Sequence, residues 1–210
     1  YDVYLGDICP EFFGWIVPEN ERFARIGLAV KKDTAKYFKK FISHLGYSDL
    51  NITNYQGGLI PVYVPQLKIE GSVDGVAVYL LGDSATQIKS TTGGGIIPAI
   101  SSANVLVDCI VSGKSYSSAM KKSKVHTQVW MHLVIRRVLD LFSDKDYDRL
   151  IGMLKKESIV KVLGEVDRDN PVRLLSLLLR RNPLLPVRLF FLFCKKKFFF
   201  GAWKFWKDVK

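Results

Sequence analysis

The feature that most constrains the fold is one unit of the sequence, residues 76–111. An apolar run rich in β-branched residues ends in Gly82-Asp83, and a polar loop then leads to three glycines and a long apolar run from Ile96. The first run is typical of a buried strand, and the second is typical of a helix that ends at Gly113. The unit therefore predicts a strand, a loop and a helix in direct succession.

This loop has the chemistry of a binding site for a flat, partly anionic ligand, although a Gly-Asp pair alone also suits an ordinary turn. Asp83, at the end of the strand, offers only acceptors, which suit sugar-like hydroxyl groups. The glycines carry no Cβ, so backbone amides can approach a planar ring, and the start of the helix directs free N–H groups there. The candidate binding residues are Gly82, Asp83, Ser84, Ala85, Thr92, Gly93, Gly94, Gly95 and Ile96.

A second motif is an aromatic strand. Phe12–Val17 and Phe23–Val30 predict two strands joined by a polar turn, and period-two alternation places Phe13, Trp15 and Val17 on one face. A row of large apolar side chains suits a groove for an unbranched or isoprenoid chain. It suits equally the half-buried face of an ordinary core strand, so both interpretations stay open at this point.

Around these motifs the sequence predicts strands first and helices afterwards. Helical periodicity marks Thr34–Leu45, which Gly46 ends, whereas residues 52–64 are β-rich but broken by glycines and a proline. Gly71–Gly75 predicts a turn before the apolar strand. The helix that begins at Ile96 is apolar nearly all round, so we expect it to be buried.

The second half of the chain predicts helices only. The expected segments are an amphipathic helix over Tyr116–Phe142, a helix over Tyr147–Lys156 capped by Ser143-Asp144, and short helices near Glu157 and Pro171. Strands followed by helices indicate an α+β half of something larger.

The positive charge is concentrated at the C-terminal end. The net charge is +11, and residues 171–210 supply most of it because they hold ten Lys or Arg and one acid, Asp208. These cations interleave with Leu, Phe and Trp, in runs too short to span a bilayer but typical of helices that lie in a membrane interface. A helical cap on the globular body is an alternative. Nucleic-acid binding is disfavoured, because the charge does not follow a polar groove.

The sequence carries no signal of a metal site or a disulfide framework. Cys9, Cys109 and Cys194 are far apart and odd in number, and His126 and His132 are six residues apart, which does not align two ligands on a helix. This cysteine usage favours a reducing cytosol. The chain begins without a methionine and contains no GxGxxG fingerprint, which we expect of a partial chain.

The Gly-Asp loop with its three glycines resembles the second flavin-binding motif of the geranylgeranyl reductase family of FAD-dependent oxidoreductases. Residues 13–27 are similar to that family's Tyr-x-Trp-x-Phe-Pro-Lys motif and to the glycine-containing strand after it, through Trp15, Pro18 and Gly27. Glu19 replaces the lysine of the motif, and Phe13 and Val17 replace its tyrosine and phenylalanine. Motif order and spacing agree over about half of the chain, residues 11–115, including a Gly-Leu-Ile-Pro segment at residues 58–61.

The resemblance implies an α+β fold that is the C-terminal half of a p-hydroxybenzoate-hydroxylase-like FAD fold, with an antiparallel substrate sheet, the last FAD-domain strand and helix, and a helical tail. The implied regions are residues 1–70 in the substrate-binding sheet domain, 71–115 in the returning part of the FAD-binding domain, 116–170 in a helical region and 171–210 in a basic aromatic tail that contacts a membrane.

The resemblance also implies roles for the candidate residues. Asp83 would bind the FAD ribitol, and Gly93–Gly95 would lie near the isoalloxazine, where the start of a helix favours the negatively charged reduced flavin. The residues implied to line a cavity for the isoprenoid lipid substrate are Phe13, Trp15, Val17 and Pro18.

The implied reaction is the reduction of isolated C=C bonds in geranylgeranyl chains by a cytoplasmic protein peripheral to the membrane. NAD(P)H and ferredoxin both stay open as electron donor, and no residue is identified as the proton donor. The isolated chain is expected to be inactive, because it lacks contacts to adenosine and pyrophosphate. The alternatives are a monooxygenase or a quinone-linked electron-transfer dehydrogenase of the same fold, or a non-catalytic membrane-associated fragment.

Overall fold

The computed structural model describes residues 1–47 and 51–155, and beyond them the isolated positions Val160, Lys161, Gly164, Arg173, Ser176, Leu177 and Arg180. The chain divides into two compact units. One contains Tyr1–Leu59 and Ile135–Met153, and the other contains Ile60–Val134 and Leu154–Lys210. The helices predicted near Glu157 and Pro171 and the basic aromatic tail lie outside the described residues, apart from those isolated positions.

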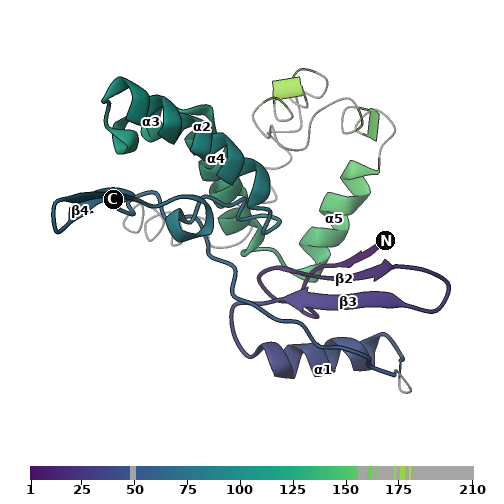
Figure 1. Ribbon diagram of the computed structural model, residues 1–210. Helices are drawn as coiled ribbons and strands as arrows, with labels where there is room; N and C mark the ends of the chain where they lie inside the picture. The colour runs from purple at the N-terminus through teal and green to yellow at the C-terminus, as the bar shows by residue number, and fades with distance from the viewer. Residues whose placement is uncertain are drawn as a thin grey trace. The chain divides into compact units, whose positions relative to one another are not determined.

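The first unit is built on a three-stranded antiparallel sheet. Its strands are β1 (Asp2–Tyr4), β2 (Phe13–Pro18) and β3 (Ala24–Ala29), in the order β1-β2-β3, with α1 (Thr34–His44) along the sheet (Figure 1). α5 (Asp144–Leu154) follows much later in the chain.

The core of this unit lies between the sheet and α1. Cys9, Leu28 and Phe41 form its buried cluster. A Cβ on Gly14 of β2 would lie 2.6 Å from the Cys9 sulfur and 2.8 Å from the Phe41 ring. Glycine at this position therefore allows the helix and the sheet to approach closely. Burial raises the pKa of the Cys9 thiol to about 11, which makes it an unreactive core residue.

The second unit contains a β-hairpin followed by helices. Its elements are β4 (Glu70–Val73), β5 (Val76–Tyr79), the 3₁₀ turn η1 (Gly82–Ala85), α2 (Ile96–Ser112), α3 (Tyr116–Lys122) and α4 (Lys124–Leu139), whose last turn belongs to the first unit. Asp74 and Gly75 turn the hairpin with φ of +50° and +81°, as a two-residue hairpin loop requires. The core cluster of this unit comprises Ile69, Ala85, Cys109, Tyr116, Met120 and Val125.

The α+β class predicted from the sequence is confirmed at the level of two small antiparallel sheets and five α-helices in the described residues. The paired strands around the aromatic motif and the helix over Thr34–Leu45 are confirmed as β2, β3 and α1. Gly113 ends α2 in the left-handed conformation at φ +65°, as predicted. Within the part of the chain that the structure describes, no helix is both long enough and apolar enough to cross a bilayer.

Of the predicted cap of the last helix, Ser143 lies just before the helix as expected, whereas Asp144 is the first residue of the helix itself. Asp146, in the first turn of α5, accepts hydrogen bonds from the Ser143 backbone N–H at 3.0 Å and from the Ser143 hydroxyl at 2.6 Å. This pairing satisfies donors at the start of α5, so the helix begins at Asp144, three residues before the predicted start.

Residues 52–64, the β-rich run that glycines and a proline break, contain no strand. One predicted segment is wrong. The single helix expected over Tyr116–Phe142 is broken into α3 and α4 at Ser123, whose hydroxyl donates to the Met120 carbonyl at 2.7 Å and accepts the His126 backbone N–H at 3.1 Å. Ser123 thus ends one helix and caps the next.

Two predictions of burial are wrong as well. β5 was expected to be a buried strand, yet all four of its residues are exposed. α2 was expected to be buried all round, yet it packs through one face and exposes several aliphatic side chains on the other. Apolar composition predicts burial only if another element covers each face, and the described residues cover one face of α2.

Candidate functional site

The loop after β5 is fixed from the inside by a buried amide. Gly82, at φ +62°, donates its backbone N–H to Oε1 of Gln87 at 2.9 Å, and the Gln87 amide donates to the Tyr116 hydroxyl at 2.9 Å. Gln87 and Tyr116 are almost fully buried. Because each of these polar groups has a partner, the network holds η1 against the first turn of α3.

The second half of the loop closes on itself before α2 begins. The Lys89 backbone N–H donates to the Gly94 carbonyl at 3.1 Å, and the Gly93 N–H donates to the Lys89 carbonyl at 2.8 Å. Gly93 has φ +73°, which favours glycine there. Thr92 accepts the Gly94 N–H at 3.4 Å. These bonds shape the turn that ends at Gly95, the N-cap of α2.

Asp83 and Gly95, twelve residues apart in the sequence, meet at the start of α2. A Cβ on Gly95 would lie 2.8 Å from Oδ1 of Asp83, so the carboxylate occupies the space that a side chain would take. On the neighbouring glycine, a Cβ on Gly94 would lie 3.0 Å from Cε of Lys89. An acidic and a basic side chain therefore flank the glycine turn at the positive end of the helix dipole.

The structure thus brings most of the loop candidates together. Asp83 and Ser84 are exposed on η1, and Thr92 and the three glycines form the turn into α2. Ser84 bonds back to Leu81, accepting its N–H at 3.2 Å and donating to its carbonyl at 2.8 Å. Ala85 is 1% exposed and packs in the core, so its side chain anchors the loop and does not face a ligand. Ile96 is largely exposed on α2.

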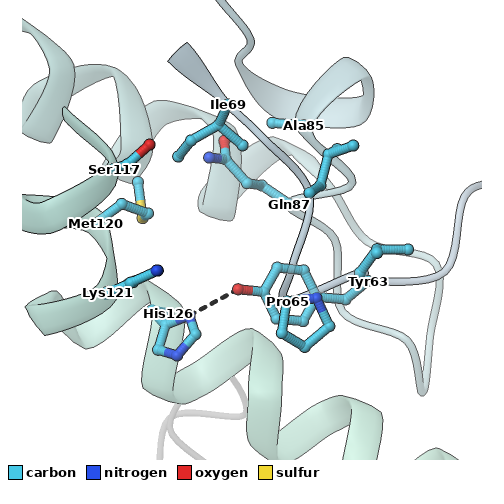
Figure 2. Close-up of a pocket in the computed structure, with 11 residues that line it drawn as sticks. Tyr63, Pro65, Ile69, Ala85, Gln87, Ser117, Met120, Lys121 and His126 are labelled. Carbon is cyan, nitrogen blue, oxygen red and sulfur yellow. Dashed lines mark hydrogen bonds between the residues drawn. The ribbon is translucent and has the colours of Figure 1, made fainter. Parts of the chain in front are cut away.

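A small cavity lies beneath the loop, between its inner side and α3 and α4. Figure 2 shows Gln87 and Ala85 of the loop on one side and Met120, Lys121 and His126 on the other. The cavity volume is about 30 Å³, which has room for about one or two waters and not for an organic ligand. Its role is therefore structural.

The polar pair in this cavity supports that interpretation. The Tyr63 hydroxyl and Nδ1 of His126 are 2.7 Å apart (Figure 2). Burial, assisted by the charge of Lys121, lowers the pKa of His126, and burial raises the pKa of Tyr63 to about 12. Both shifts favour the neutral forms, so the pair is an uncharged hydrogen bond that ties the segment before β4 to α4.

The aromatic motif lies in the other unit, on the sheet face opposite α1. Phe13, Trp15 and Val17 are half-buried and alternate with the buried Gly14 and Ile16, as period two predicts. The ring centroids of Phe13 and Trp15 are 5.7 Å apart, and those of Phe12 and Phe13 are 4.6 Å apart. The result is a continuous aromatic surface along β2, with Pro18 exposed at its end.

Gly27 on β3 makes this aromatic surface possible. A Cβ on Gly27 would lie 2.6 Å from Cε2 of Trp15, so the indole rests on the glycine of the paired strand. Glu19, which departs from the lysine of the family motif, forms an ion pair with Arg25 across the turn. Its charge is thus partnered within the hairpin.

Sequence reasoning missed the residues that hold the loop in place. Gln87 lies inside the polar loop, where nothing marks it as buried, and Tyr63 meets His126 only through the fold. Within the described ranges, no three His, Cys, Asp or Glu side chains gather into a cluster that could hold a metal ion.

Comparison with known proteins identifies digeranylgeranylglycerophospholipid reductases among the relatives of this chain. The chain is 31% identical over 191 residues to the digeranylgeranylglycerophospholipid reductase of Methanococcus aeolicus, covering 79% of the chain and 44% of the relative. It is 30% identical over 178 residues to the enzyme of that name from Methanocaldococcus jannaschii. This match covers 80% of the chain and 41% of the relative. The match to the Methanocella arvoryzae reductase is 27% identical over 210 residues and covers 88% of the chain and 48% of the relative.

The chain spans less than half the length of these curated relatives. No family model and no solved structure matches it. The name of these relatives agrees with the resemblance of the Gly-Asp loop and the aromatic strand to motifs of the geranylgeranyl reductases. We conclude that the chain is homologous, over less than half of their length, to the digeranylgeranylglycerophospholipid reductases.

Proposed function

We propose that this chain supplies the second flavin-contacting loop and part of the substrate sheet of an FAD-dependent reductase that saturates C=C bonds in geranylgeranyl lipid chains. The observation that carries the proposal is the contact of Asp83 with Gly95 at the start of α2. It places a hydroxyl-binding carboxylate, three glycines and a helix N-terminus at one point of the surface. The homology to digeranylgeranylglycerophospholipid reductases supports this class of substrate.

The residues at this point fit FAD. The Asp83 carboxylate is exposed and offers acceptors for the hydroxyl groups of a ribitol chain. Gly93, Gly94 and Gly95 add no side chain to the turn, so a flat ring system can approach its backbone where Asp83 and Lys89 do not already lie against it. The N–H groups at the start of α2 favour negative charge, which a reduced flavin carries.

In this proposal the roles of the chain's own residues are distinct. Asp83 binds the ribitol, Gly93–Gly95 lie against the isoalloxazine, and Gln87 keeps the loop in position through its bonds to Gly82 and Tyr116. FAD, when bound, supplies the hydride for the reduction.

The aromatic surface of β2 is the proposed wall of the lipid cavity. Phe13, Trp15, Val17 and Pro18 present apolar area without charge along one face of the sheet. A long isoprenoid chain binds through buried apolar area and needs few polar contacts, which this face satisfies.

The finer architecture is part of the same proposal. The chain forms the C-terminal half of a p-hydroxybenzoate-hydroxylase-like fold, with residues 1–70 in the substrate domain, 71–115 in the FAD domain, 116–170 in a helical region and 171–210 in a tail that contacts the membrane. The protein is cytoplasmic and peripheral to the membrane, and its electron donor is NAD(P)H or ferredoxin.

The test is product formation by the protein expressed from its complete open reading frame. The purified protein is incubated without oxygen with a digeranylgeranyl glycerophospholipid and dithionite, and lipid masses are followed. The proposal predicts stepwise addition of hydrogen pairs to the lipid. Unchanged lipid from a preparation with bound FAD would contradict the proposed substrate, and turnover of another substrate only with oxygen would favour a monooxygenase.

A further inference from the structure

Lys89 is the one basic residue in the sequence of the Gly-Asp loop, residues 82–95. Its backbone pairs with Gly94 in an antiparallel bridge, in which the Lys89 N–H donates to the Gly94 carbonyl at 3.1 Å. The Lys89 carbonyl accepts the N–H groups of Gly93 at 2.8 Å and Thr92 at 3.1 Å. Three backbone hydrogen bonds therefore fix the position of Lys89 relative to the glycines.

The Lys89 side chain lies along the glycine turn. A Cβ on Gly94 would lie 3.0 Å from Cε and 3.5 Å from Nζ of Lys89, so the ammonium group is held beside the backbone of the turn. Lys89 is half-buried, and its neighbours Ile88 and Ser90 are buried. A partly buried cation is screened less by solvent than an exposed one, so its field acts on a group bound at the turn.

The two charged side chains at the turn act in opposite directions. Asp83 lies against Gly95, where a Cβ would be 2.8 Å from Oδ1, whereas Lys89 lies against Gly94. A carboxylate opposes the gain of negative charge by a nearby group, and an ammonium group favours it. Lys89 therefore offsets the effect of Asp83 and acts in the same direction as the N-terminus of α2.

We propose that Lys89 is a flavin-binding residue that favours the reduced, negatively charged form of FAD over the oxidised form and so raises its reduction potential. Charge beside the flavin ring is one of the means by which a protein tunes this cofactor. The inference rests on the proposed function, because it requires FAD at the glycine turn. It adds the side chain that distinguishes the two oxidation states of the cofactor.

The experiment measures the reduction potential of FAD bound to the protein expressed from its complete open reading frame. Wild type, Lys89→Gln and Lys89→Arg are reconstituted with excess FAD. The affinity for oxidised FAD is measured by flavin fluorescence, and the midpoint potential is measured by anaerobic reduction against a reference dye.

Lys89→Gln should lower the affinity for reduced FAD relative to that for oxidised FAD. A tenfold fall in this ratio moves the midpoint potential of a two-electron couple by about 30 mV, and we expect a shift of at least about that size toward negative values. Lys89→Arg keeps the positive charge and returns the potential toward the wild-type value. Thermal unfolding of each variant verifies the fold, since the substitutions leave the three backbone bonds of residue 89 in place.

Lys114→Gln is the matched control. Lys114 is exposed just beyond the C-terminal end of α2, roughly 25 Å from Gly95 along a helix that rises 1.5 Å per residue. This variant removes the same charge from the same unit and keeps the wild-type potential. An equal negative shift in Lys114→Gln and Lys89→Gln would assign the effect to net charge and overturn the proposal.

Failure of this inference is distinguishable from failure of the proposed function. FAD bound to Lys89→Gln at the wild-type potential overturns the role of Lys89 and leaves the proposed function in place. Equal losses of affinity for oxidised and reduced FAD also leave the potential unchanged and overturn it, because Lys89 then binds FAD without distinguishing its two states. A wild-type protein that binds no FAD overturns both.

Discussion

Gly27 illustrates at the residue scale how one missing side chain organises a surface. The Trp15 indole fills the space above it, and Trp15 in turn lies beside Phe13 on the same strand. The aromatic surface of β2 therefore depends on a glycine of β3. The sequence motif marks both residues, but only the structure shows that one rests on the other.

Replacement of Gly27 tests this contact. Gly27→Ala places a Cβ 2.6 Å from Cε2 of Trp15, so the indole must move, and we expect a loss of about 1–3 kcal/mol in the free energy of unfolding. Urea unfolding of the 210-residue chain measures it, with tryptophan emission as the probe. Gly152→Ala in α5 is the control, since nothing lies within 4 Å of its Cβ and the change favours the helix. Equal effects of the two variants would refute the contact.

His126 makes stability depend on pH. Burial, with a contribution from Lys121, lowers its pKa below the ordinary value of 6.5, so the folded protein binds fewer protons than the unfolded chain near that pH. The free energy of unfolding therefore falls as pH decreases through 6.5 toward the folded pKa. His126→Gln flattens this slope. A slope that persists in His126→Gln would rule out the assignment.

At the scale of elements, Gln87 couples the loop to α3. Gln87→Leu removes the acceptor of the Gly82 N–H and the donor to the Tyr116 hydroxyl, both buried. We expect a loss of about 1–3 kcal/mol per group left without a partner. Chemical denaturation measures this loss, with Gln56→Leu at an exposed position as the control. A stability equal to the wild type would show that the loop is held by other contacts.

Local sequence pattern predicts where several elements lie but not whether they are buried. The two strands around the aromatic motif, the first helix and the Gly113 stop follow from period and cap residues, which act within a few residues. The burial of β5 and α2 cannot be predicted from local pattern, because it depends on which other elements pack against them. The break at Ser123 was missed because a serine inside an amphipathic pattern can also face solvent without capping a helix.

At the scale of the whole molecule, the candidate loop was predictable as a segment but not as a site. Its strand, glycines and helix are contiguous, so their order is visible in the sequence. The contact between Asp83 and Gly95 and the bond between Tyr63 and His126 join residues that are 12 and 63 positions apart, and only the tertiary fold brings them together. The division into two units was likewise not predictable, because residues from both ends of the described chain form the first unit.

The two units carry the two halves of the proposed chemistry. The aromatic surface belongs to one, and the Gly-Asp loop to the other. The proposed reaction needs both, and each of the two features lies within one compact unit. Changes in the aromatic surface should therefore alter lipid turnover without altering flavin content.

The most direct measurement of the central claim is the flavin content of the protein expressed from its complete open reading frame. The wild type is expected to bind FAD at about one per chain. Asp83→Ala should weaken retention at least about tenfold, the equivalent of one lost hydrogen bond to a charged group. Asp108→Ala, at an exposed position on α2 away from the loop, should retain FAD as the wild type does. Equal FAD content in Asp83→Ala and the wild type would contradict the account.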